Sequence, residues 1–259
     1  MKKGQFLRIV VVLLFAYVSG QTGIQEKASG TQVAYFLPAS SEHETIIDYT
    51  GFSLLYSETH EQAVWVAYEL TAEEVHTRKA NRLNRFNEDN RIPTGSASNL
   101  DYYKSGFDRG HLAPAADMRF SQQAMEESFL YSNISPQRPA FNRGIWASLE
   151  DKTREWAVEN SAISIVTGPV LSEEKYPTIG PNEVSVPEFF FKVILDHIEP
   201  EYKAIGFLIP NHGTDRPISE YARSVREIEQ VTGLDFFYLL DDDIEEQVET
   251  AVQIELWGL

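Results

Sequence analysis

Four apolar segments constrain the fold of this chain more than any other feature of its sequence. Each is rich in β-branched and aromatic residues, as strands are. They are residues 63–70, 162–171, 184–197 and 202–210. The intervening helical patterns cover residues 121–131, 141–158 and 217–231. The last of these begins at Pro217 and ends at Gly233, which are typical helix-boundary residues. Because helices and strands do not alternate regularly, the pattern predicts an α+β fold rather than a doubly wound sheet.

The first 20 residues are typical of a secretory signal peptide. Lys2 and Lys3 precede an apolar run over residues 9–18, and the small residues Ser19 and Gly20 follow. The alternative is an uncleaved membrane anchor, but the run is shorter than the roughly 20 residues that span a bilayer. The sequence therefore predicts cleavage after Gly20, a periplasmic or secreted protein, and no membrane contact afterwards.

The remainder is predicted to form one domain. Residues 21–45 are polar and read as a linker and lead-in, and residues 46–259 are long enough for one large core. The acidic segment 241–249 is predicted to form a packed C-terminal helix, with Trp257 among its apolar anchors. The chain has no cysteine, which excludes a disulfide scaffold, a thiol nucleophile and any cysteine-ligated metal site.

A first cluster of reactive side chains lies at residues 107–114 (FDRGHLAP). His111 has the side chain best suited to accept a proton near neutral pH. Arg109 is able to grip a phosphate through two parallel hydrogen bonds, and Asp108 is a charged residue that orients its neighbours. Gly110 lets the backbone bend or approach another group closely. Taken alone, this cluster fits an ordinary structural role better than a catalytic one.

A second cluster follows at residues 133–154. Asn142, Trp146, Glu150 and Arg154 are spaced by four, which on a helix places them along one slowly drifting face. An asparagine oxygen is a hard, neutral ligand that suits Mg²⁺. The alternative is a surface helix in which Glu150 and Arg154 form an ordinary ion pair worth about 0.3–0.5 kcal/mol.

Together, the two clusters resemble the DNA/RNA non-specific endonucleases, a family of secreted sugar-non-specific nucleases and mitochondrial endonuclease G. The family signature Asp-Arg-Gly-His, with an apolar residue and Ala-Pro, matches residues 108–114, and its Asn-Ile-Ser-Pro-Gln stretch matches residues 133–137. The later Asn, Trp, Leu-Glu and Arg match residues 142–154. The resemblance covers about residues 46–240 and includes further matches at 65–68, 167–169, 186–193 and 232–237.

The resemblance implies a mixed body with a central antiparallel sheet and a ββα-metal active site, also called a His-metal finger. His111 is then the general base, and Asn142 is the sole protein ligand of a divalent ion, Mg²⁺ or another such as Mn²⁺. Glu150 orients water bound to that ion, and Gln137 and Asp108 support the site. Arg109 and Arg154 contact the phosphate. DNA and RNA are the implied substrates, and the products carry 5′-phosphate.

Three alternatives remain open from the sequence. The family's upstream arginine matches Arg82 or Arg85, and the context favours Arg85. The charges of Arg78, Lys79 and Arg91 serve either as general backbone-binding charge or as solvated surface. The second function considered is a catalytically silent nucleic-acid- or protein-binding member of the same fold, which the intact trio of His111, Asn142 and Glu150 disfavours.

The net charge of −17 does not exclude nucleic acid as a substrate. Between Arg78 and Arg154 there are 12 basic and 9 acidic residues, whereas the rest of the chain has 10 basic and 30 acidic. The acidity therefore lies in the flanks. We expect a local, salt-sensitive grip on nucleic acid, which suits a hydrolase better than a coating protein.

Overall fold

The computed structural model describes residues 36–41, 44–171, 175–198 and 202–259. The expected signal peptide and most of the lead-in lie outside these ranges. Within them, a seven-stranded sheet runs in the order β1-β2-β3-β6-β9-β10-β11, and every neighbouring pair is antiparallel. Its strands are β1 (Ile46–Asp48), β2 (Ser53–Ser57), β3 (Gln62–Thr71), β6 (Ala162–Pro169), β9 (Phe189–Asp196), β10 (Lys203–Pro210) and β11 (Ala222–Arg223).

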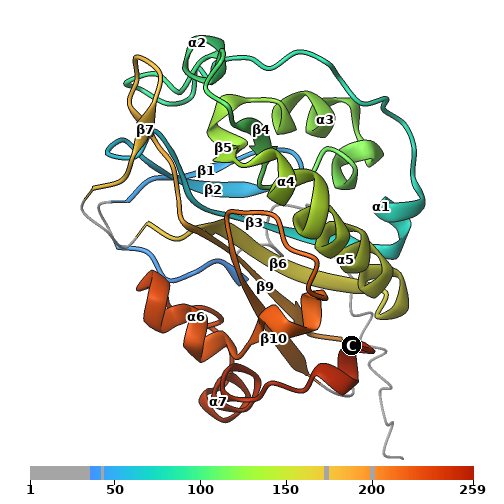
Figure 1. The fold of residues 1–259 in the computed structure, drawn as a ribbon. Coiled ribbons are helices and arrows are strands. Elements are labelled where there is room, and N and C mark those ends of the chain that lie inside the picture. The colour runs from blue at the N-terminus through green and yellow to red at the C-terminus, as the bar shows by residue number, and fades with distance from the viewer. Residues whose placement is uncertain (1–35, 42–43, 172–174, 199–201) are drawn as a thin grey trace, which may run out of the picture.

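Two small strand pairs and several helices surround the sheet (Figure 1). The pairs are β4 (Asp108–His111) with β5 (Ile134–Gln137), and β7 (Thr178–Ile179) with β8 (Val184–Ser185). The helices are α1 (Ala72–His76), α2 (Asn99–Tyr102), α3 (Gln122–Ser128), α4 (Pro139–Phe141), α5 (Ala147–Glu159), α6 (Val225–Thr232) and α7 (Asp242–Thr250). Strands, helices and antiparallel sheet together confirm the α+β fold expected from the sequence.

Both faces of the sheet are covered, which explains why its strands read as continuous apolar runs. Phe190 and Ile194 of β9 point into a core that includes Trp156 of α5. Phe191 and Val193 point into a second core, which includes residues of α6 and α7. Figure 1 shows α5 and the β4–β5 pair on one side of the sheet and α6 and α7 on the other. The site residues on β4, β5 and α5 therefore share one face.

The strand expected over residues 184–197 is wrong as a continuous element. The structure has the short strand β8, then β9 from Phe189 onward. Pro187 lies between them, and proline has no backbone N–H to donate to a sheet. The strands expected over 63–70, 162–171 and 202–210 are confirmed, as β3, β6 and β10.

The helix expected over residues 217–231 begins later than predicted. A 3₁₀ turn and β11 precede α6, whose N-cap is Ser224. The Ser224 side chain accepts from the backbone N–H of Glu227 and the Glu227 side chain returns to the Ser224 backbone, so a capping box sets the start. The predicted end is confirmed, because Gly233 caps α6 with a left-handed φ of 72°.

The helix expected over residues 141–158 is interrupted near its start. Asn142–Trp146 form a π-helical turn in which Gly144 has non-helical angles, φ −107° and ψ −113°. The regular helix α5 begins only at Ala147. Asn142 therefore does not continue the face on which Glu150 and Arg154 lie. The helix expected over 121–131 is present but shorter, as α3.

The C-terminal segment packs as expected. Helix α7 contributes the buried Val248 to the second core, and Trp257 is buried in the first. The indole Nε1 of Trp156 donates to the Trp257 carbonyl at 2.7 Å, which fastens the chain end to α5. Among the described residues, no helix combines the length and apolar character needed to cross a bilayer.

Candidate active site

The strand pair β4–β5 carries the Asp-Arg-Gly-His motif. Asp108 pairs with Gln137 in register, and His111 pairs with Ile134. At Gly110 the strands are so close that a Cβ would lie 2.1 Å from the Gln137 side chain. This glycine is therefore required by a close approach rather than by a positive φ. Gln137 is fully buried, and neither its amide nitrogen nor its amide oxygen has a hydrogen-bond partner among the described residues.

Asp108 joins the strand pair to the π-helical turn. Its Oδ2 accepts from Asn142 Nδ2 at 3.0 Å and from Arg143 Nε at 2.8 Å, and its Oδ1 accepts from Arg143 Nη2 at 2.6 Å. Burial raises the pKa of the Asp108 carboxyl, but the hydrogen bonds from Arg143 and Asn142 lower it more, so the net pKa is below its usual value. Because Nδ2 of Asn142 is committed to Asp108, the Oδ1 of Asn142 is the atom left to bind a cation.

A second ion pair fixes the other end of the same segment. Arg154 Nη1 donates to Asp117 Oδ1 at 2.8 Å, and Tyr68 donates its hydroxyl to Asp117 Oδ2 at 2.9 Å. Asp117 begins the 3₁₀ turn Asp117–Phe120, six residues after His111. His111 thus lies on a segment that is held against residues 142–154 on both sides, at Asp108 and at Asp117. In place of the Glu150–Arg154 ion pair that was the alternative from the sequence, Arg154 pairs with Asp117 and with Asp151.

His111 is buried among aromatic rings. Its ring centroid lies 4.8 Å from that of Phe129, edge-on, and 5.4 Å from that of Phe86. Its Nε2 is buried without a hydrogen-bond partner among the described residues. Burial, and then the charge of Arg82, lower the pKa of His111 to about 3. The imidazole is therefore neutral at pH 7.

The neighbouring arginines differ in how firmly they are held. Arg109 Nε donates to the Tyr131 hydroxyl at 3.0 Å and Nη2 donates to Asn99 Oδ1 at 2.5 Å, so its guanidinium is positioned. The guanidinium carbon of Arg82 lies 5.3 Å from the centroid of the Phe129 ring that contacts His111. No hydrogen bond or ion pair joins Arg85 to the site in the described part of the chain. The structure thus places Arg82 nearer to His111, against the preference for Arg85.

Glu150 belongs to a buried charge cluster that was not expected from the sequence. Lys192 of β9 is fully buried on the α5 side of the sheet, with its Nζ 5.1 Å from the centroid of the Trp146 ring. Burial raises the pKa of Glu150 and lowers that of Lys192, and the attraction between the two charges opposes both shifts. Asp117 belongs to the same cluster. The one sign of this cluster in the sequence is Lys192, a lysine inside an apolar strand, which indicates a buried counter-charge.

The structure therefore brings most of the expected residues to one place. Asp108, Asn142, Glu150 and Arg154 are joined to the His111 segment through direct contacts or the shared cluster. Arg109 and Gln137 lie on the same strand pair. A strand pair that carries a buried neutral histidine, joined through Asp108 to a helical turn that carries an amide oxygen, is the arrangement of the ββα-metal nuclease fold.

Comparison with known proteins agrees with this assignment. A profile of the DNA/RNA non-specific endonuclease family matches residues 29–243. Human mitochondrial endonuclease G is 34% identical over 220 residues, which cover 80% of this chain and 73% of the relative. The mitochondrial nuclease EXOG of Danio rerio is 33% identical over 244 residues, covering 88% and 71%. The chain belongs to the DNA/RNA non-specific endonuclease family and is an enzyme of that class.

A solved structure supports the fold in the same way. The crystal structure of an EndoG/EndoGI complex, which concerns EndoG inhibition, superposes with a TM-score of 0.77 at 30% identity. The superposition covers 84% of this chain and 94% of the other. A mitochondrial nuclease of Saccharomyces cerevisiae is 34% identical over 71% of this chain and 63% of its own length.

Proposed function

We propose that this enzyme is an exported, divalent-metal-dependent endonuclease that hydrolyses phosphodiester bonds in DNA and RNA without sequence preference. The observation that carries the proposal is the Asp108–Asn142 contact, which joins the histidine strand to the candidate metal-binding turn. Contacts confined to backbone phosphate account for indifference to sequence, because phosphates carry no direct sequence information. The catalytic domain is proposed to start at residue 46.

His111 is proposed to take a proton from the attacking water. Its neutral imidazole is available over the whole physiological pH range, since its pKa is lowered to about 3. General base catalysis of this kind contributes typically about 10²–10⁴-fold to the rate. Arg109, which is held by Tyr131 and Asn99, and Arg154, which is held by Asp117, are proposed to neutralise charge on the phosphate. The leaving group is the 3′ oxygen, so the products carry 5′-phosphate.

The residues present fit a divalent ion of the Mg²⁺ type. Such ions prefer oxygen donors and retain several waters, so a single protein ligand is enough. Asn142 would hold the ion through Oδ1, and Asp108 fixes the orientation of that amide by accepting from Nδ2. When bound, Mg²⁺ or Mn²⁺ would act as a Lewis acid on the phosphate and leaving oxygen. Glu150 is proposed to orient metal-bound water, and Gln137 is proposed to support the strand pair.

The test is cleavage of plasmid DNA and of RNA by the purified protein, with Mg²⁺ or with EDTA. We expect cleavage of both polymers with the metal and none with EDTA. His111→Ala is expected to lose at least about 10²-fold in rate. His212→Ala removes an exposed histidine from a turn and serves as the matched control. Wild-type protein that cleaves neither polymer with any divalent ion would favour the silent binding protein instead.

Export is proposed from the first 20 residues of the sequence. The matched relatives include proteins named as mitochondrial, and an apolar, basic leader is able to direct a protein to other compartments. Fractionation of the cells that make the protein, with sequencing of its mature N-terminus, tests export. A mature chain that begins near Gln21, outside the cytoplasm, supports it. A full-length chain that starts at Met1 contradicts cleavage.

A further inference from the structure

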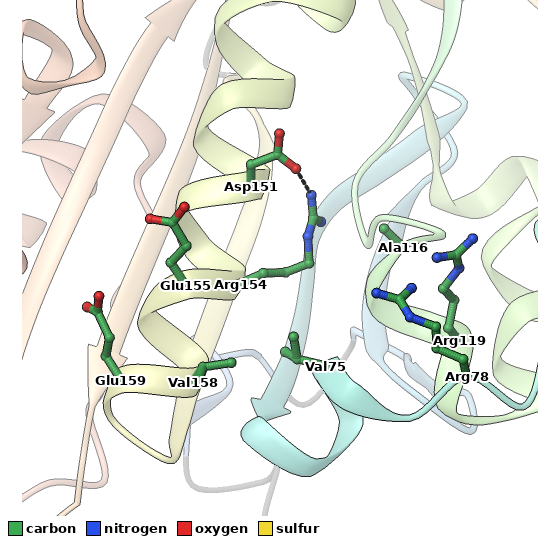
Figure 2. A pocket seen from close by; sticks show the side chains of 9 residues that line it. All are labelled: Val75, Arg78, Ala116, Arg119, Asp151, Arg154, Glu155, Val158 and Glu159. Atoms are coloured by element: carbon green, nitrogen blue, oxygen red, sulfur yellow. Dashed lines mark hydrogen bonds and ion pairs between the residues drawn. The ribbon is translucent and has the colours of Figure 1, made fainter.

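A pocket of about 560 Å³ lies beside Arg154, at the C-terminal half of α5. One wall consists of the segment after α1 and the 3₁₀ turn that begins at Asp117, and the opposite wall is α5 (Figure 2). Arg154 extends from α5 toward the space between the walls (Figure 2). The pocket is therefore continuous with the phosphate contacts of the proposed active site.

The first wall presents two arginines without counter-charges. Arg78 and Arg119 both line the pocket. The backbone N–H groups of Lys79 and Ala80 donate to the Arg119 carbonyl at 2.9 and 3.0 Å, which holds the two arginines as neighbours. In the described ranges, no ion pair or side-chain hydrogen bond engages either guanidinium. Two adjacent positive charges repel, and an anion with several oxygens placed between them removes that repulsion.

The opposite wall is acidic, and its acids are mostly engaged. Asp151, Glu155 and Glu159 are spaced by four along α5 and line the pocket together (Figure 2). Asp151 pairs with Arg154, and Glu155 pairs with Lys152 at 3.0 Å. The pocket therefore has one positively charged wall and one negatively charged wall. A phosphate that enters is repelled by α5 and directed to the two free arginines.

Arg154 connects the pocket to the proposed active site. It lines the pocket together with Arg78 and Arg119, and its Nη1 donates to Asp117, which begins the 3₁₀ turn that carries Arg119. A strand whose cleaved phosphate lies at Arg154 is therefore able to continue into the pocket toward Arg78 and Arg119.

We propose that Arg78 and Arg119 form a subsite for a backbone phosphate of the substrate strand, next to the cleaved bond. The proposal rests on the proposed function, because it takes a single nucleic-acid strand as the ligand. It resolves the open role of Arg78, whose charge is placed on the strand path rather than in solvent. Glu155 and Glu159 limit affinity at the subsite, which favours release of the product.

The test is the salt dependence of binding in the His111→Ala background. Affinity for a fluorescent single-stranded DNA oligonucleotide is measured in EDTA from 50 to 300 mM NaCl. For single strands, log K falls with log[salt] at about 0.7 per phosphate contact. Arg78→Ala and Arg119→Ala together are expected to flatten the slope by about 0.7–1.4 and to weaken binding at least fivefold. Arg223→Ala, at the sheet edge, is the control for loss of one arginine.

Two further variants keep the test decisive. Arg78→Lys with Arg119→Lys retains both charges and is expected to retain the slope. Glu155→Gln with Glu159→Gln is expected to tighten binding at least twofold. Each variant is compared with its parent by thermal unfolding, so that a loss of fold is distinguished from a loss of contact.

The outcomes separate the two proposals. An unchanged slope in the alanine pair, when the protein with His111 intact cleaves DNA, overturns the subsite and leaves the proposed function standing. A flattened slope, when the protein with His111 intact binds DNA but does not cleave it, overturns the proposed function and leaves the subsite standing. A slope that flattens equally in Arg223→Ala overturns the subsite, because the effect is then general charge.

Discussion

Replacing Gly110 by alanine tests how closely β4 and β5 must approach. A Cβ at this position would lie 2.1 Å from both Cδ and Oε1 of Gln137 and 2.4 Å from its Cγ. Gln137 is fully buried. Overpacking of this kind costs typically about 1–3 kcal/mol. For a domain of this size, about 2 kcal/mol lowers the melting temperature by roughly 4–8 °C.

The assay is thermal and urea unfolding of four proteins: wild type, Gly110→Ala, Gln137→Ala and the double variant. Gln137→Ala removes all three atoms that the new Cβ would meet. Gln137→Ala also removes two buried amide atoms that lack hydrogen-bond partners among the described residues. The loss of folding stability in Gln137→Ala is therefore smaller than the burial of the side chain alone would suggest. The double variant is therefore expected to be about as stable as Gln137→Ala, with a coupling of about 2 kcal/mol.

Two results would refute this reasoning. Wild-type stability in Gly110→Ala means that the strands separate at no cost. Additive losses in the double variant mean that Gln137 is not the residue that the Cβ meets. In either case the glycine of the motif is needed for another reason, such as approach of the substrate.

Two further predictions concern buried charges. Lys192→Met removes the positive charge that opposes protonation of Glu150, so Glu150 stays protonated to higher pH. The acidic limb of the pH–rate profile should then move to higher pH by about one unit or more. A profile whose acidic midpoint does not move contradicts this role of Lys192. Glu249 is buried, and its pKa is raised from about 4.5 in the unfolded chain to about 8 in the folded protein. The folded state therefore loses stability as the pH rises from about 4.5 to 8. Glu249→Gln should therefore be more stable than wild type by about 1 kcal/mol at pH 8.5 and by less at pH 5, measured by urea unfolding; an equal difference at both pH values would contradict it.

The sequence predicts much of this site because many of the site residues lie close together along the chain. Asp108, Arg109 and His111 lie within four residues, and one short strand carries them all. Glu150 and Arg154 keep their helical spacing because α5 is regular between them. Asn142 does not keep that spacing. The helical pattern does not predict the π-helical turn Asn142–Trp146, in which Gly144 has non-helical backbone angles.

The partners of the site residues were not predictable in the same way. Asp117 joins Arg154 across 37 residues, and Lys192 reaches the cluster from β9, 42 residues after Glu150. Such contacts depend on the order of strands in the sheet. Hydrophobic periodicity indicates which face of each helix or strand is buried, but it does not indicate the order of the strands. The sequence leaves the choice between Arg82 and Arg85 open for the same reason, because it depends on packing such as that of Arg82 over the Phe129 ring that contacts His111.

The arrangement of charge leads to a prediction about salt. The acidic helix α7 lies across the sheet from the site (Figure 1), so its carboxylates are separated from the arginines proposed to face the substrate. On this proposal Arg109, Arg154 and the Arg78–Arg119 pair make three to four phosphate contacts. The logarithm of kcat/KM for single-stranded DNA should then fall with log[salt] with a slope of about −2 to −3. A slope flatter than about −1 means that the arginines do not touch the strand, and one steeper than about −5 means that far more of the surface does.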